Sequence, residues 1–235
     1  MHNLSARRIC AASALALFTA AVASAQIGIG VQAGVLSSGS VINFVENGNE
    51  EEIDTDNVTG LLVGIPVEIA ISNVFSIQPE LNYLRRGYKV PEDLDDFQPE
   101  EQSTYNVLEL PILAKLGYTT ENFTVAATLG PSIQYVLGGT AEVGEFNVGG
   151  LSVEGSEVDI DFDSEEFENI DRTNVYGLAG LQFGIPIGFG KFLIDGRYRF
   201  NLREDNQSGD DTFELNVRDR GLSLTAGIMV TLGDY

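Results

Sequence analysis

The segment Asp159-Ile-Asp-Phe-Asp163 contains the residue types that could most directly bind a cation. Carboxylates at alternate positions, Asp159, Asp161 and Asp163, resemble the beginning of a calcium-binding loop. Such a loop needs Gly at its sixth position and Glu at its twelfth, where this chain has Ser164 and Ile170. A solvated acidic loop is therefore the preferred interpretation, and weak Ca²⁺ binding at extracellular concentrations stays open as the alternative. No other cofactor is predicted.

The first 25 residues have the three features of a secretory signal peptide in the correct order. Arg7 and Arg8 precede an apolar run over 9–22, and an A-x-A cleavage site follows at 23–25. We expect 1–25 to be cleaved and 26–235 to form one domain. The single His, His2, and the single Cys, Cys10, are removed with this segment.

Most catalytic and metal chemistry is then excluded for residues 26–235. Without an imidazole or a thiol there is no Cys nucleophile, no triad with a His base, no disulfide and no His or Cys metal ligand. The sequence predicts a protein that is not an enzyme. Its net charge of -22 also argues against nucleic acid as a partner, because a polyanion binder needs clustered Lys and Arg.

Apolar residues alternate with polar or small residues in eight segments, the pattern of strands with one apolar face. The glycines at 28, 30 and 34 superficially resemble a dinucleotide-binding loop, but they fall on alternate positions of the first segment and no helix follows. The eight predicted strands cover 27–35, 59–71, 75–88, 105–118, 123–137, 174–187, 191–202 and 217–232.

Short and long links between these strands alternate. Short turns lie at 72–74, 119–122 and 188–190, and long links at 37–58, 91–104, 138–173 and 203–216. The long links hold 28 of the 35 acidic residues and only Arg172 and Arg203 among the basic ones. This arrangement predicts an all-β, eight-stranded antiparallel up-and-down transmembrane β-barrel with short periplasmic turns and four long acidic external loops. The predicted location is the outer membrane of a Gram-negative bacterium, with outer-membrane lipid around the barrel.

Two soluble folds are the alternatives. A lipocalin-like barrel would turn a charged face to water, but the non-apolar faces of the first, fifth and eighth segments carry uncharged Gly, Ser, Thr and Gln. A secreted β-sandwich would need short links at both ends. The membrane barrel is therefore preferred.

Extending the alternation places four acids and four bases on the inward face. An eight-stranded barrel is just wide enough to be filled by side chains, so these charges are expected to pair as a buried network that plugs the lumen. The alternative is a selectivity constriction. The eight residues are Glu68, Glu80, Glu109, Asp195, Arg86, Lys115, Arg197 and Arg199.

Three stretches, 77–88, 108–116 and 130–135, resemble outer-membrane β-barrel proteins of the PorT-like group, which is common in Bacteroidetes. The resemblance implies the same barrel fold over 26–235 and structural rather than catalytic roles for the matching residues Glu80, Gly87, Glu109, Pro111 and Gly130. It also implies accessory work for a secretion system as one function. The final strand resembles the signal read by the barrel-assembly machinery, although the terminal aromatic, Tyr235, is out of phase with Leu232.

Two classes of function remain for such a barrel. In the first, it is an anchor whose acidic loops bind ions, a surface polymer or a protein partner. In the second, it is a small pore or transport component. The acidity of the loops either serves such binding or adapts the protein to high salt.

Overall fold

The computed structural model describes residues 26–46, 49–90, 100–148, 151–160, 162, 172–202, 205–208 and 213–232. The expected signal peptide, 1–25, and two of the three candidate calcium ligands, Asp161 and Asp163, lie outside these residues. Within them, the model contains no helix of the length and hydrophobicity required to span a membrane. The elements found in this part of the chain are β-strands.

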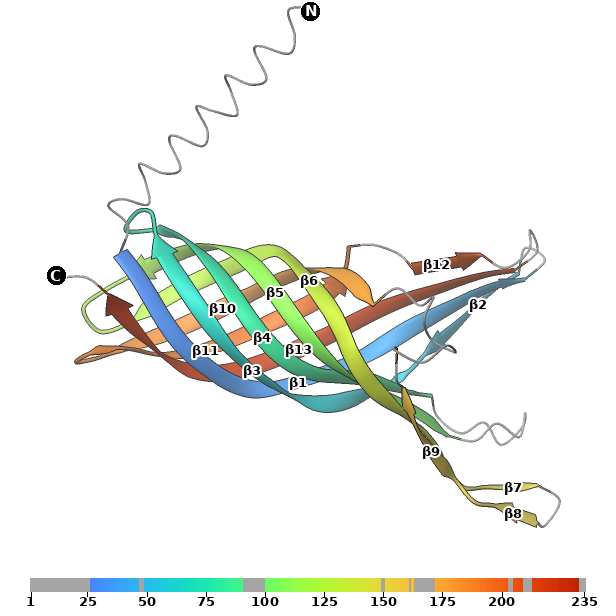
Figure 1. Cartoon of the computed structure of the whole chain (residues 1–235). Coiled ribbons are helices and arrows are strands. Elements are labelled where there is room, and N and C mark those ends of the chain that lie inside the picture. The colour runs from blue at the N-terminus through green and yellow to red at the C-terminus, as the bar shows by residue number, and fades with distance from the viewer. Residues whose placement is uncertain are drawn as a thin grey trace, which may run out of the picture.

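Eight long antiparallel strands form a closed ring, as predicted (Figure 1). Consecutive long strands pair with each other, and the first and last strands close the ring through a register that runs from Ile27 opposite Leu232 to Glu46 opposite Phe213. The strands are β1 (Gln26–Glu46), β3 (Asp56–Ala70), β4 (Phe75–Val90), β5 (Glu101–Thr119), β6 (Thr124–Val143), β10 (Thr173–Ile187), β11 (Gly190–Asn201) and β13 (Phe213–Leu232).

Side chains alternate between the outside and the inside of this ring in the predicted phase. In β1, for example, Val31 is 63% exposed, whereas the next residue, Gln32, is only 8% exposed. The same contrast holds around the ring, where exposed Leu, Ile, Val and Tyr residues alternate with buried Ser, Thr, Gln and charged residues. An apolar outer surface around a polar interior is the inverse of a water-soluble protein, and it suits a lipid environment.

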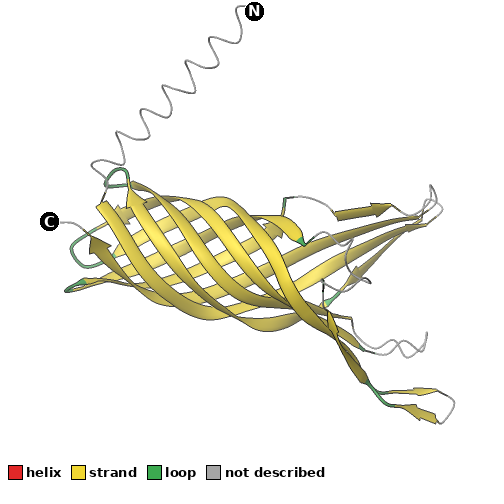
Figure 2. Ribbon diagram, in the orientation of Figure 1, coloured by secondary structure: helices red, strands yellow, loops and turns green. Residues whose placement is uncertain are grey.

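The segments predicted as long loops contain further strands, so this part of the prediction was wrong. The link at 37–58 is mostly a hairpin, because β1 continues to Glu46 and pairs with β2 (Asn49–Asp54). Backbone ladders extend past the point where apolar alternation ends, since their hydrogen bonds do not require an apolar face. Figure 2 shows the resulting strands projecting from one end of the barrel. The others are β7 (Phe146–Val148), β8 (Leu151–Val153), β9 (Ser156–Ile160) and β12 (Asp205–Ser208).

Two inward-facing glycines mark places where neighbouring backbones approach closely. A Cβ atom on Gly34 would lie 2.0 Å from the carbonyl oxygen of Leu224, and one on Gly60 would lie 1.9 Å from that of Arg85. No side chain larger than hydrogen fits at such distances without a shift of the strands. The glycine-rich start of β1 therefore serves the packing of the barrel wall.

Candidate functional site

All eight charged residues predicted for the lumen lie on strands of the ring and contribute to ion pairs. The most deeply buried are Glu109, Lys115 and Asp195, whose exposed fractions are 0%, 3% and 3%. Charged groups removed from water to this extent need partners, and the structure provides them from strands across the ring. The set Glu68, Glu80, Arg86, Glu109, Lys115, Asp195, Arg197 and Arg199 is here called the lumen network.

At the centre of the lumen network, Arg197 of β11 binds Glu80 of β4. The two strands are four positions apart in the ring of eight, so the pair spans the interior from opposite walls. The distance from Arg197 Nη1 to Glu80 Oε2 is 2.7 Å, and that from Nη2 to Oε1 is 2.8 Å. Arg197 Nη2 also donates to Asp195 Oδ2 at 3.0 Å. A two-bond contact between a guanidinium and a carboxylate is strong and directional, so it fixes both side chains.

A second pair lies one inward position further along β11. Arg199 donates to both oxygens of Glu109 of β5, from Nε at 3.1 Å and from Nη2 at 2.9 Å to each oxygen. Gln134 Nε2 adds a hydrogen bond of 2.8 Å to the same carboxylate. Glu109 therefore has partners from β11 and β6 although it is fully buried.

Side-chain amides connect these two pairs. Gln78, Asn82 and Gln32 all donate to the carboxylate of Glu80, at 2.7, 3.0 and 3.2 Å. Asn82 also lies 3.4 Å from Glu109 Oε2, which links the two carboxylates through one amide. Through these bonds, the two central ion pairs belong to one continuous hydrogen-bonded network.

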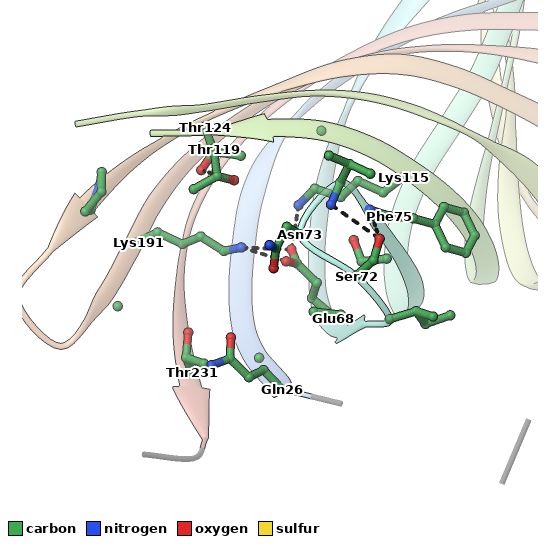
Figure 3. A pocket seen from close by; sticks show the side chains of 18 residues that line it. Gln26, Glu68, Ser72, Asn73, Phe75, Lys115, Thr119, Thr124, Lys191 and Thr231 are labelled. Atoms are coloured by element: carbon green, nitrogen blue, oxygen red, sulfur yellow. Dashed lines mark hydrogen bonds and ion pairs between the residues drawn. The ribbon is translucent and has the colours of Figure 1, made fainter. Parts of the chain in front are cut away.

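Toward the short-turn end of the barrel, Glu68 of β3 lies between two lysines. Lys115 Nζ is 2.5 Å from Glu68 Oε2, and Lys191 Nζ is 2.8 and 2.9 Å from the two carboxylate oxygens. Figure 3 shows both ammonium groups directed at Glu68. A cavity of about 640 Å³ lies beside them. Lys191 was absent from the predicted network. It has the same parity in the strand as Asp195, so extending the alternation to the first residues of β11 would have found it.

Toward the long-loop end, Arg86 pairs with Asp219 of β13, a second residue that sequence reasoning missed. Asp219 also accepts hydrogen bonds from Tyr176 and Ser40, both at 2.6 Å. The guanidinium of Arg86 lies 5.6 Å from the ring centre of Tyr176, within the range of a cation–π contact. Asp219 is in phase with the inward residues of β13, so the same extension would have identified it.

An apolar cluster also lies inside the ring, and nothing in the predicted network anticipated it. Its members are buried side chains that lie closer to the long-loop end than the ion pair of Glu80 and Arg197. Phe162 is packed among them. The Arg172 guanidinium lies 5.1 Å from the Phe162 ring centre. Interior apolar residues were hidden in the sequence because both faces of the strands are apolar at these points. The cluster comprises Leu36, Leu62, Leu84, Val107, Val136 and Phe162.

The candidate calcium site has only one ligand within the described residues. Asp159 is exposed on β9, while Asp161 and Asp163 lie outside the part that the structure describes. The described ranges contain no group of three His, Cys, Asp or Glu side chains placed to hold a metal ion. Weak Ca²⁺ binding in this loop therefore stays a prediction.

A comparison with protein families decides the assignment. The model of the family described as "Outer membrane protein beta-barrel domain" matches residues 19–204. The chain belongs to this family. As a member of the outer membrane protein beta-barrel domain family, it is located in the outer membrane of Gram-negative bacteria, as the sequence predicted. No curated protein matches the chain in sequence.

Solved structures similar to this outer membrane protein beta-barrel domain are distant in sequence. Ail of Yersinia pestis, solved with the heparin analogue sucrose octasulfate, is 18% identical, with a TM-score of 0.38, and the match covers 87% of this chain and 99% of that one. OprG from Pseudomonas aeruginosa is 9% identical, with a TM-score of 0.46 and coverages of 86% and 95%. The outer membrane protease OmpT from Escherichia coli is 11% identical, with a TM-score of 0.42 and coverages of 88% and 97%.

Proposed function

We propose that this outer-membrane barrel is a non-enzymatic anchor with a plugged lumen, which holds acidic segments at the cell surface for binding. The observation that carries the proposal is the pairing of charges across the interior. Five carboxylates contact five cationic groups there, once Asp219 and Lys191 are added to the lumen network. An interior whose charges are satisfied by one another has little affinity left for a passing ion.

The ion pairs also obstruct the path physically. In a barrel of eight strands the interior is only wide enough for side chains, and here pairs such as Arg197 and Glu80 reach across it. Their side chains are 7% and 0% exposed. Opening a channel would separate such desolvated charges, which costs several kcal/mol per pair.

Surface binding is the second half of the proposal and rests on charge. The long links carry 28 of the 35 acidic residues, and strands such as β2 and β9 present part of this charge beyond the ring. A field of one sign attracts cations and basic surfaces from solution and repels polyanions. The partner classes that fit are divalent cations, a cationic surface polymer or a protein with a basic patch. An enzymatic role is disfavoured because His2 and Cys10 are the only residues of their types.

A small pore is the second candidate, and the cavity beside Glu68 is the observation that favours it. This cavity extends into the short-turn end of the barrel as far as Lys115. Membership of the PorT-like group, with an accessory role in secretion, is a further proposal. It is supported by the motif residues Glu80 and Glu109, which form the centre of the lumen network.

Conductance in planar lipid bilayers tests the plugged lumen. We expect purified, folded protein to give no steady single-channel openings at moderate voltage and salt. Steady openings of uniform size would instead support the pore. Copurification of a periplasmic or outer-membrane complex with the tagged chain would support the accessory role in secretion and remove the isolated anchor.

A further inference from the structure

The cavity at the short-turn end is built unlike the rest of the interior. It has a volume of about 640 Å³, within the range typical of small-ligand sites, and it lies between strand ends and the turn at 71–74 (Figure 3). Its polar lining includes hydroxyl and amide groups, and three charged residues, Glu68, Lys115 and Lys191, form part of its wall. We call this space the vestibule.

The two lysines of the vestibule differ in how fully they are bound. Lys115 Nζ contacts Glu68, Gln182 and Gln78, so each of its three N–H groups has an acceptor, and its side chain is 3% exposed. Lys191 Nζ contacts only the two oxygens of Glu68 within the described residues, and its side chain is 20% exposed. An ammonium group has three donors, so at least one donor of Lys191 is available to the vestibule.

Charge is also unevenly distributed along the lumen. At the vestibule, two ammonium groups share one carboxylate, Glu68, which leaves an excess of one positive charge. The opposite excess lies deeper, where Glu80 and Asp195 share Arg197. The wall of the vestibule therefore carries a positive excess, although the chain as a whole has a net charge of -22.

Neutral donors surround this positive charge. The hydroxyl oxygen of Ser72 accepts from the backbone N–H of Phe75 at 3.1 Å, which leaves its own O–H able to donate. The amide of Asn73, at the tip of the same turn, lines the vestibule and makes no hydrogen bond to the described part of the chain. Charged and neutral N–H and O–H donors around one cavity are the groups that bind anionic oxygens.

We propose that the vestibule binds a small soluble anion with carboxylate or phosphate oxygens, and that Glu68 occupies part of this site as an internal competitor. The carboxylate of Glu68 already shows which chemistry the lysine pair accepts. An incoming anion binds the available donor of Lys191 together with donors of the turn, and it competes with Glu68 for the shared ammonium groups. The interior beyond Glu68 stays closed, so the anion binds without crossing the barrel.

Two variants and one control test the proposal with the full chain folded in detergent. Inorganic phosphate and acetate are titrated separately at constant ionic strength, with binding followed by ³¹P line width and by saturation transfer from the protein. Lys191→Gln should weaken binding about tenfold or more by removing a charge-assisted donor, and Glu68→Gln should strengthen it about tenfold by removing the competitor. Lys89→Gln should leave binding unchanged, because Lys89 pairs with Glu100 at the long-loop end, away from the vestibule.

The comparison of phosphate with acetate shows which anion the vestibule prefers, and heat-modifiable migration on a gel verifies that each variant is folded. Equal binding by the parent chain, Lys191→Gln and Lys89→Gln would overturn the site, as would weaker binding by a folded Glu68→Gln variant. Absence of binding to the parent chain and to Glu68→Gln alike would overturn it too. None of these outcomes bears on the plugged lumen, which bilayer conductance tests separately.

Discussion

Arg197 and Glu80 form a two-bond ion pair that joins opposite walls of the barrel, at 2.7 and 2.8 Å. Their strands, β11 and β4, do not pair with each other through the backbone. The ion pair therefore acts as a strut, a direct link between opposite walls of the barrel. Backbone hydrogen bonds cannot provide such a link, because they join only neighbouring strands. Its loss would affect both the stability of the wall and the closure of the lumen.

Removing one partner of this strut should be costly. Arg197→Leu leaves Glu80 and Asp195 buried without their cation, and we expect a loss of about 3–5 kcal/mol in the free energy of unfolding. Urea unfolding in lipid vesicles, followed by tyrosine fluorescence and gel migration, measures it. The matched control is Arg220→Leu, which breaks an exposed pair with Asp54 and should cost about 0–1 kcal/mol. Similar losses in both variants would show that the interior is hydrated.

The cluster around Asp219 allows a graded test. Asp219→Ala removes one ion-pair partner of Arg86 and the acceptor of two hydroxyl groups, so it should destabilise the barrel by about 3–5 kcal/mol. Tyr176→Phe removes only one hydrogen bond to the carboxylate and should cost about 1.5–3 kcal/mol. Thermal unfolding of the two variants side by side gives the order. If Tyr176→Phe proves the more damaging change, Asp219 does not hold this cluster together.

Emptying the lumen should turn the anchor into a channel. The variant carries Glu80→Ala, Arg197→Ala, Glu109→Ala and Arg199→Ala together with Asp195→Asn, because Asp195 would otherwise lose its cation when Arg197 is removed. We expect steady conductance in planar bilayers where the parent protein shows none, because the removed side chains leave a water-filled path. Heat-modifiable migration confirms that the variant is folded. A folded variant that stays closed would mean that other side chains, such as the apolar cluster, seal the barrel.

Close backbone contact at Gly34 predicts sensitivity to a single methyl group. Gly34→Ala places a Cβ 2.0 Å from the Leu224 carbonyl oxygen, so the β1–β13 seam must shift, at a cost of about 1–3 kcal/mol. Gly196→Ala is the control, because a Cβ there meets no atom within 4 Å. The temperature at which each variant loses its folded gel mobility compares them. Identical temperatures would show that the seam tolerates the extra methyl group.

Protease access tests the orientation of the barrel and the calcium hypothesis together. We expect a protease of broad specificity added to intact cells to cut within 138–173, which contains eleven acidic residues, while the turns at Ser72, Thr119 and Gly188 stay protected. Ca²⁺ should slow this cutting if Asp159, Asp161 and Asp163 share an ion. Equal rates with and without Ca²⁺ would remove the calcium site and keep the orientation. Cutting at the turns instead would reverse the orientation.

Strand positions were largely predictable because one physical pattern determines them. A lipid-facing wall forces apolar residues onto every second position, and the predicted ranges lie within or close to the eight long strands of the ring. The positions at which these strands end on the side of the long links were not predictable from this pattern. Residues 39–46 of β1, for example, pair along their whole length with β13 without regular apolar alternation.

The site was predictable in its composition but not in its pairing. Parity alone placed Glu80, Glu109 and Arg197 inside, since a residue's face is fixed by its position along the strand. Partners depend on how strands are arranged around the ring and on strand tilt, which the sequence does not show directly. Asp219 and Lys191 were missed for a simpler reason. Both lie near the first residues of their predicted strands, where the alternation of apolar and polar residues is not yet regular.

The seam between β1 and β13 has a consequence for how the protein reaches its folded state. Ile27 pairs with Leu232, so the contact that closes the ring joins residues separated by almost the entire described chain. Such distant pairing makes folding slow, because the ends must meet before the seam stabilises the product. Until β13 has been synthesised and delivered, β1 presents an unpaired edge along which another strand could add. Protection of that edge during export is therefore a requirement that this topology imposes on the cell.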